Sequence, residues 1–305
     1  MHSEPGNPGI VVGIDGSPDS NAALQWAVGE ATMRSVALTL VYAAAAAPGG
    51  SRVLEWTGDC APTEFVEELG ATARRVLADA VKIVEDKTDS DSRPRINNEV
   101  ISESPVSALV ELSTKADMVV VGSRGHGTLD RVLLGSVSTG LVHHAHCPVA
   151  VIRNEVAALV EGCVLVGVDG SLASQLATAI AFDEASWRGA ELVALHAWTD
   201  AELPDIPRRE WAAPPPTPWT ELQSVAEETL AERLAGWQER YPDVIVHREV
   251  VIDRPARHLV ERSESAQLVV VGSRGRGGFA GMLLGSVSTA VVHAVRTPVI
   301  VARGR

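Results

Sequence analysis

Short apolar, β-branched runs alternate with amphipathic stretches along the whole chain. The run at residues 10–14 ends in Asp-Gly-Ser-Pro, which is typical of a buried strand followed by a turn. Residues 20–34 carry apolar side chains at helical spacing, so a helix is expected there. By the same criteria the first half should contain further strands at 37–43, 96–101, 118–121 and 149–152 and helices at 64–86, 106–115 and 137–145.

The second half repeats this alternation. Strands are expected at 164–168, 192–197, 244–252, 268–271 and 299–301, and helices at 173–187, 222–240, 256–265 and 287–295. Because strands alternate with helices, each half predicts a parallel sheet with right-handed crossovers and helices on both faces. The fold class expected from the pattern is α/β, with two tandem doubly wound domains of five strands each.

The two halves are an internal duplication. Residues 122–151 and 272–301 share 17 identical amino acids in 30 aligned positions, at an offset of 150. The segment Val-Gly-Ile-Asp-Gly-Ser at 12–17 recurs as Val-Gly-Val-Asp-Gly-Ser at 166–171, at an offset of 154. Because the offset hardly changes, each half is expected to be one complete domain.

The length of the chain indicates two domains, and its charge argues against a nucleic-acid-binding protein. The 305 residues suit two domains of ordinary size, expected at 1–155 and 160–305. The formal net charge is −13 and the arginines are scattered or lie in glycine-rich segments, so nucleic acid is not an expected partner. Without a long apolar stretch or a secretory signal, no membrane insertion and a cytoplasmic location are expected.

Cysteine and histidine do not form a recognisable metal site. The three cysteines, Cys60, Cys147 and Cys163, contain no CxxC pair, which argues against a disulfide framework and a zinc site. The histidines of segment 143–147 lie at a predicted helix end, and only the first of them recurs in the second half. Packing is favoured over metal binding there, and no metal ligands are predicted.

A glycine-rich motif follows the fourth predicted strand of each half. It reads Gly-Ser-Arg-Gly at 122–125, then nine residues, then Gly-Ser at 135–136, and it recurs at 272–275 and 285–286. Glycines let backbone N–H groups approach a phosphate, and a helix that begins at the serine adds further N–H donors. The arginines that would reinforce such a contact are Arg124, Arg131, Arg274 and Arg276. A structural turn with a serine N-cap explains a single copy equally well, but two copies with one spacer length favour phosphate binding.

The motif matches neither of the two common nucleotide-binding loops. It lacks the lysine of a Walker A loop. It also differs from the Rossmann fingerprint, which follows the first strand of its sheet, because it follows the fourth. Asp15 and Asp169 end the first predicted strand of each half, near the crevice where open α/β sheets bind ligands. Their carboxylates can accept hydrogen bonds from a ribose or an adenine amine, or can simply hold the turn before the next helix. Their position favours the first interpretation.

Together, the two G-x2-G-x9-G-S motifs, the Asp-Gly-Ser segments and the terminal strands 149–152 and 299–301 resemble the universal stress protein family in its tandem ATP-binding form. The resemblance covers nearly the whole chain. It implies the strand order 3-2-1-4-5, ATP with or without Mg²⁺ as the cofactor, and a homodimer formed through the fifth strand. It also implies that adenine lies near the strand-1 aspartate and the end of the second strand.

These considerations give one candidate site in each half. The residues of the first are Gly13, Asp15, Ala43, Gly122, Ser123, Arg124, Gly125, His126, Gly127, Arg131, Gly135, Ser136 and Val137. The residues of the second are Gly167, Asp169, Ala197, Gly272, Ser273, Arg274, Gly275, Arg276, Gly277, Gly278, Gly285, Ser286 and Val287.

Three functions remain open at this point. The resemblance favours an ATP-binding regulator of stress response or growth, read by an unknown protein partner. A slow ATPase or related hydrolase is the second, although no Asp/Glu pair is placed for acid–base hydrolysis and no catalytic residue is assigned. A sink for cyclic nucleotides is the third. The irregular segments 48–63 and 199–219 are either lids over the sites or solvated insertions.

Overall fold

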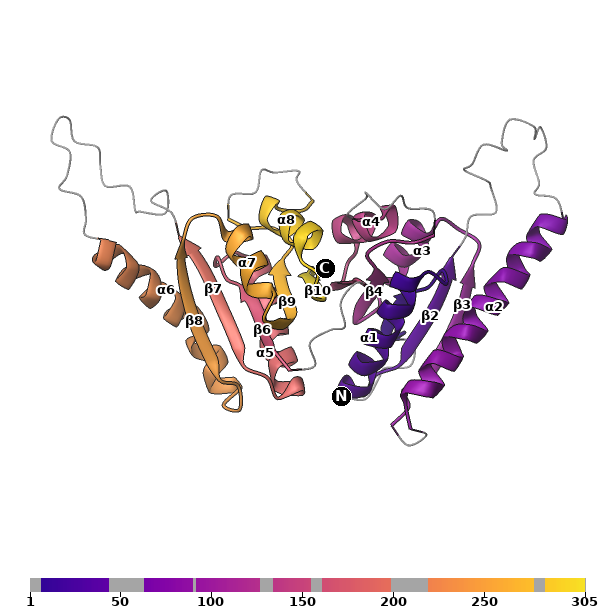
Figure 1. Ribbon diagram of the computed structural model, residues 1–305, viewed down its shortest axis with the longest axis horizontal. Helices are drawn as coiled ribbons and strands as arrows, with labels where there is room; N and C mark the ends of the chain where they lie inside the picture. The colour runs from indigo at the N-terminus through magenta and orange to yellow at the C-terminus, as the bar shows by residue number, and fades with distance from the viewer. Residues whose placement is uncertain are drawn as a thin grey trace, which may run out of the picture. The chain divides into compact units, whose positions relative to one another are not determined.

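The chain consists of two units that divide near the middle of the sequence (Figure 1). The computed structural model describes residues 7–43, 63–89, 92–126, 134–154, 161–198, 219–276 and 283–304. The units are Met1–Ala157 with Arg303–Arg305, and Ala158–Ala302. The predicted site residues Gly127, Arg131, Gly277 and Gly278, the cysteine Cys60 and nearly all of segments 48–63 and 199–219 lie outside the described residues.

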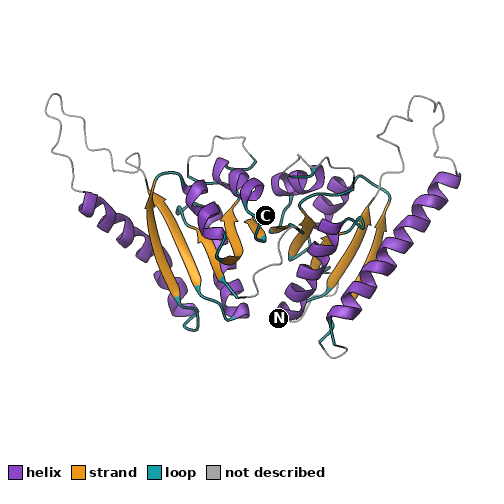
Figure 2. Ribbon diagram, viewed as in Figure 1, coloured by secondary structure: helices purple, strands orange, loops and turns teal. Residues whose placement is uncertain are grey.

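The first unit alternates strands and helices as predicted. Its elements are β1 (Ile10–Gly13), α1 (Pro18–Arg34), β2 (Leu38–Ala43), α2 (Thr63–Lys87), β3 (Ile96–Ile101), α3 (Pro105–Leu112), β4 (Met118–Gly122), α4 (Ser136–His144) and β5 (Val149–Ile152). The strands pair in parallel in the order β3-β2-β1-β4-β5. Helix α1 packs with α2, and α3 packs with α4, so helices cover both faces of the sheet (Figure 2).

The second unit repeats this order. Its elements are β6 (Cys163–Gly167), α5 (Leu172–Arg188), β7 (Leu192–Trp198), α6 (Trp219–Arg240), β8 (Val246–Ile252), α7 (Pro255–Ser263), β9 (Ala266–Gly272), α8 (Ser286–Ala294) and β10 (Val299–Ala302). The strands pair in parallel in the order β8-β7-β6-β9-β10. This is the expected order 3-2-1-4-5 in both units, and the predicted doubly wound α/β fold is confirmed.

The central strands form the core because helices cover them on both sides. Ile10, Val11 and Val12 of β1 are fully buried, as are Val119 and Val120 of β4. Such continuous apolar runs are characteristic of parallel strands without a solvent-facing side. Strand β3, at the end of its sheet, alternates between half-buried and exposed positions instead.

The loop after β1 is short because α1 begins with strong local signals. Ser17 is the N-cap, and its hydroxyl accepts the N–H of Ser20, while Pro18 occupies the first helical position. Ser171 caps α5 in the same way and accepts the N–H of Ser174. These caps fix where the chain turns after the strand-1 aspartate, at the edge of the sheet that carries the glycine motif.

A few predicted boundaries were wrong by two or three residues. The end of α3 falls at Leu112 because Thr114 and Lys115 form i→i−3 hydrogen bonds that tighten the last turn. Strand β8 begins at Val246, since the N–H of Val244 is bonded to the carbonyl of Tyr241 in a turn after α6. Apolar character alone does not reveal either turn.

Candidate functional site

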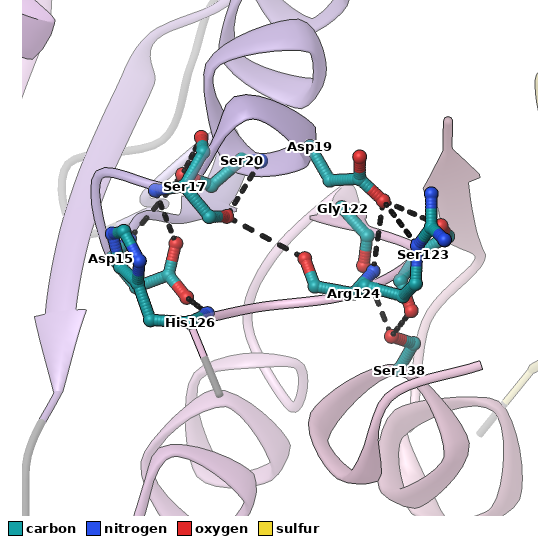
Figure 3. A network of polar contacts seen from close by, with 9 residues as sticks. All are labelled: Asp15, Ser17, Asp19, Ser20, Gly122, Ser123, Arg124, His126 and Ser138. Carbon is teal, nitrogen blue, oxygen red and sulfur yellow. Dashed lines mark hydrogen bonds and ion pairs between the residues drawn. The ribbon is translucent and has the colours of Figure 1, made fainter. Parts of the chain in front are cut away.

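Asp15 joins the end of the first strand to the glycine-rich loop of the same unit (Figure 3). One carboxylate oxygen accepts the backbone N–H of Ser17 at 2.9 Å, which closes a turn before α1. The other accepts the backbone N–H of His126 at 3.1 Å. The loop that follows β4 is therefore held against the carboxyl end of β1, where the sequence predicted both.

These hydrogen bonds control the charge of Asp15. Burial by itself raises the pKa of the carboxyl, because the charged form loses water. Hydrogen bonds from Ser17 and from the backbone N–H of His126 favour the charged form, and together they hold the pKa below the ordinary value of 3.8. Asp15 is thus a carboxylate at neutral pH and can accept further hydrogen bonds from a ligand.

A second carboxylate, Asp19 on the first turn of α1, holds the opposite side of the loop (Figure 3). Its Oδ2 accepts the hydroxyl of Ser123 at 2.6 Å and the backbone N–H of Arg124 at 3.1 Å. The guanidinium Nε of Arg124 lies 3.5 Å from the same oxygen. The loop is fixed between two aspartates, only one of which the sequence analysis identified.

The glycines of the loop have different structural roles. A Cβ on Gly122 would lie 2.6 Å from the carbonyl carbon of Asp19 and 2.8 Å from the nitrogen of Ser20, so α1 can only approach a glycine. A Cβ on Gly125 would lie 2.5 Å from Oδ2 of Asp15. The first glycine allows a helix to pack closely, and the second makes room for the strand-1 carboxylate.

Helix α4 presents its N-terminus to the same loop. Gly135 is the N-cap, no side chain caps the helix, and the N–H of Gly135 donates to the carbonyl of Ser123 at 2.7 Å. The hydroxyl of Ser138 donates at 3.0 Å to the carbonyls of Gly122 and Ser123. The first N–H groups of α4 have no acceptor within the helix and can bind an anion.

A cavity of about 430 Å³ lies at this edge of the sheet. Its walls combine backbone of the glycine-rich segments, the Asp15 carboxylate and a mainly apolar side formed by β2 and α3. The lining residues are Gly13, Ile14, Asp15, Ser20, Val41, Ala43, Pro105, Leu109, Val121, Gly122, Arg124, Gly125, His126, Gly135, Ser136, Val137 and Ser138. A cavity of this size suits a small molecule with one apolar and one anionic part.

The second unit reproduces the essential contacts. Asp169 accepts the backbone N–H of Ser171 at 2.9 Å and that of Arg276 at 3.1 Å. A Cβ on Gly275 would lie 2.6 Å from Oδ2 of Asp169. The hydroxyl of Ser288 donates to the carbonyl of Gly272 at 2.5 Å. The aspartate–glycine arrangement is therefore built twice, once within each unit.

Most of the described residues that the sequence singled out in the first half come together around this cavity. Ser123 is the exception, because it is fully buried, donates its hydroxyl to Asp19 and does not line the cavity. The sequence analysis missed Asp19 and Ser138, and of the apolar wall it identified Ala43 but not Val41 or Leu109. Ser138 belongs to the repeated segment Gly-Ser-Val-Ser-Thr, which was a usable signal, whereas Asp19 is not repeated and has Ala173 at the corresponding position of the second half.

Among the described residues, no group of three or more His, Cys, Asp or Glu side chains is placed to hold a metal ion. His143 and His144 have their ring centroids 6.2 Å apart, and Cys147 is buried. None of the described helices combines the length and apolar character that a membrane span requires.

The chain matches known proteins over almost its full length. The sequence profile of the Universal stress protein family matches residues 8–153 and, a second time, 163–303. Universal stress protein Rv2005c of Mycobacterium tuberculosis is 51% identical over 302 residues, which is 97% of each chain. Universal stress protein Rv2623 of the same organism is 49% identical over 306 residues, or 99% of each chain.

Solved structures agree with the fold. A universal stress protein from Archaeoglobus fulgidus superimposes with a TM-score of 0.66 at 22% identity, covering 98% of this chain and 99% of its own. The protein PA1789 from Pseudomonas aeruginosa, described as functionally unknown, superimposes with a TM-score of 0.62 at 16% identity, covering 98% and 93%. On its duplicated fold, its twofold profile match and its close relatives, this chain belongs to the universal stress protein family.

Proposed function

We propose that each unit binds one molecule of ATP, with or without Mg²⁺, in the crevice between the strand-1 aspartate and the glycine-rich loop. The observation that carries the proposal is the repeated contact between that carboxylate and the loop amide, made by Asp15 with His126 and by Asp169 with Arg276. Two copies of one arrangement, beside a cavity of about 430 Å³ in the first unit, favour a ligand over a purely structural turn.

The chemistry of the cavity walls suits the two ends of a nucleotide. Val41, Ala43 and Leu109 offer an apolar surface for an adenine ring, next to a carboxylate that accepts hydrogen bonds from ribose or adenine. The backbone of Gly125 and the start of α4 at Ser136 offer N–H donors to phosphates. Ala197 and Ser286 occupy the corresponding positions of the second unit.

The proposed biological role is a cytoplasmic, nucleotide-dependent regulator of stress response or growth. Nucleotide occupancy would change the protein surface that a protein partner reads. A homodimer through the fifth strand of each sheet, β5 and β10, is part of the same proposal. Sedimentation with and without ATP tests the assembly, and a monomer under both conditions would contradict the dimer alone.

Nucleotide binding is best tested by blocking each cavity separately. Ala43 is half-buried at the end of β2, and Ala197 is half-buried one residue before the end of β7, so Ala43→Trp and Ala197→Trp place an indole ring where adenine is expected. Isothermal titration with ATP should show one site fewer in each variant than in the parent chain. Val100→Trp and Ile252→Trp are matched controls, because these exposed residues lie on the neighbouring strands β3 and β8. No ATP binding to the parent chain, with or without Mg²⁺, would refute the proposal.

Hydrolysis and cyclic-nucleotide binding are alternatives that the same protein can test. Mass spectrometry of the small molecule that co-purifies identifies the bound nucleotide directly. Single-turnover measurements with ATP favour an enzyme if hydrolysis is steady and is lost when both cavities are blocked. Competition between ATP and cyclic AMP measures whether the cavities prefer a cyclic ligand.

A further inference from the structure

The two glycine-rich loops begin with the same sequence but have different neighbours. Both read Gly-Ser-Arg-Gly, at 122–125 and 272–275. At the offset of 154 that relates the first helices of the two units, Asp19 of α1 corresponds to Ala173 of α5. The helices approach the loops equally closely, since a Cβ on Gly122 would meet the backbone of Asp19 and a Cβ on Gly272 that of Ala173.

In the first unit, the Asp19 carboxylate occupies the donors on one side of the loop. It accepts the Ser123 hydroxyl and the Arg124 backbone N–H, and it pairs with the Arg124 guanidinium. The Asp19 side chain is only 9% exposed and that of Arg124 22%, so water screens this pair less than it would a surface pair. The positive charge of Arg124 is therefore largely neutralised before any ligand arrives.

In the second unit, the same donors lack this partner. The hydroxyl of Ser273 forms no hydrogen bond with another residue among those described, and it is open to solvent. Within the same described ranges, neither the N–H nor the guanidinium of Arg274 has a hydrogen-bond or ion-pair partner. Arg274 is also exposed, whereas Arg124 is half-buried.

At two of the described positions, the second unit alone carries an arginine near the site. Arg276 stands where the first unit has His126. The Arg233 guanidinium lies against the turn after Asp169, since a Cβ on Gly170 would be 2.8 Å from its central carbon. Gly16 is the corresponding glycine of the first unit. A Cβ on Gly16 would have a methyl carbon of Val76 as its nearest neighbour, at 3.4 Å.

We infer that the two sites are unequal, and that the second unit binds nucleotides more tightly with each added phosphate while Asp19 suppresses this dependence in the first. The inference rests on the proposed nucleotide binding and assigns its specificity to the Asp19/Ala173 position. An additional carboxylate near a phosphate opposes binding by Coulomb repulsion, and it competes for the guanidinium and hydroxyl that would contact the phosphate. Removing it should strengthen ATP binding about threefold to tenfold.

The test compares ATP, ADP and AMP at each site alone. Ala197→Trp leaves the first site for titration, and Ala43→Trp leaves the second. The ratio of ATP to AMP affinity should be about tenfold larger at the second site and should fall more steeply with added salt. Equal ratios and equal salt dependence at the two sites would overturn the inference.

Reciprocal exchanges at the assigned position then identify the cause. Asp19→Ala should raise the ratio of ATP to AMP affinity at the first site, and Ala173→Asp should lower that ratio at the second. Asp19→Asn keeps a hydrogen-bond acceptor without the charge, so it should behave like Asp19→Ala if charge decides. An Asn variant that binds like the parent chain would assign Asp19 a positioning role only. If the parent chain binds no nucleotide at all, the proposed function fails, whereas binding that the exchanges leave unchanged contradicts only the inequality.

Discussion

Gly122 ends β4 and Gly125 lies three residues further on in the loop that follows, and each excludes a side chain for a different reason. At Gly122 the obstacle is the backbone of α1, which cannot move without shifting the helix. At Gly125 the obstacle is the carboxylate of Asp15, a side chain that is itself part of the candidate site. Substitution of the first therefore acts on folding, and substitution of the second acts on the site.

We predict that Gly122→Ala destabilises the protein by about 2 kcal/mol or more, because a Cβ within 2.6 Å of backbone carbon forces α1 away from the sheet. Urea unfolding measures the effect. Gly29→Ala is the matched control, since Gly29 lies inside α1 and a Cβ there would meet no atom within 4 Å apart from the neighbouring backbone of the helix itself. The control should be stabilised by about 0.5–1 kcal/mol. Similar stabilities for the two variants would show that α1 tolerates the added methyl group.

Asp15 gives a prediction about pH. Its pKa is lowered in the folded protein, so its hydrogen bonds stabilise the fold above the ordinary value of 3.8. This contribution is lost as the pH falls through the folded pKa, which lies below that value. Asp15→Asn should lower the free energy of unfolding by about 1 kcal/mol at neutral pH, and the difference from the parent should shrink below about pH 4.

Denaturant unfolding over a pH series measures this difference. Asp86→Asn serves as the control, because Asp86 is an exposed carboxylate of α2. A difference between Asp15→Asn and the parent that stays constant down to the acid transition would contradict the proposed role of the carboxylate charge.

At the level of elements, the sequence predicted the strands and helices well because buried parallel strands and capped helices have strong local signals. The strands 96–101 and 149–152 were predicted with the bounds that the structure has. The turn at Val244 and the short end of α3 were not predicted, because they depend on hydrogen bonds that apolar patterns do not encode. Asp19 was missed for a related reason. A carboxylate on the first turn of a helix is usual near the dipole, and only the fold brings it to Arg124.

Helices α1 and α5 each carry a buried ion pair in their last turns. Glu30 with Arg34 and Glu184 with Arg188 are spaced four residues apart, and the glutamate side chains are 1% and 0% exposed. Removing one partner of such a pair leaves a charge in a low dielectric, whereas replacing both with apolar residues restores packing. The pairs are therefore expected to be strongly coupled.

We predict that Arg34→Met destabilises the protein by about 3 kcal/mol, because Glu30 remains buried and loses the partner that lies 3.2 Å from its carboxylate. The double variant Glu30→Met with Arg34→Met should recover most of the loss. Thermal and urea unfolding of the two single variants and the double variant form a double-mutant cycle. Additive losses in the cycle would show that the two side chains contribute independently.

At the scale of the whole molecule, the residues that shape the crevice are the same in both units, whereas the residues around it differ. The aspartate after the first strand, the two spaced glycine segments and the serine of the last helix occur in both units. Ala173 stands in place of Asp19, and Arg276 in place of His126. The glycine after the strand-1 aspartate faces Val76 in the first unit and Arg233 in the second. The sequence revealed the shared part as a repeat, whereas the contact of Asp19 with the loop could be seen only once separate elements were brought together.

Because each crevice is built from residues of one unit, we predict that the chain binds two nucleotides, each of which stabilises the protein. Equilibrium dialysis with labelled ATP should give two molecules per chain, one after either Ala43→Trp or Ala197→Trp, and none after both. ATP at about one hundred times its dissociation constant should add about 2.7 kcal/mol of stability for each site that remains, by mass action on the folded state. If Ala43→Trp alone abolished all binding, the two crevices would have to act as a single site, and the independence that the repeated architecture implies would be wrong.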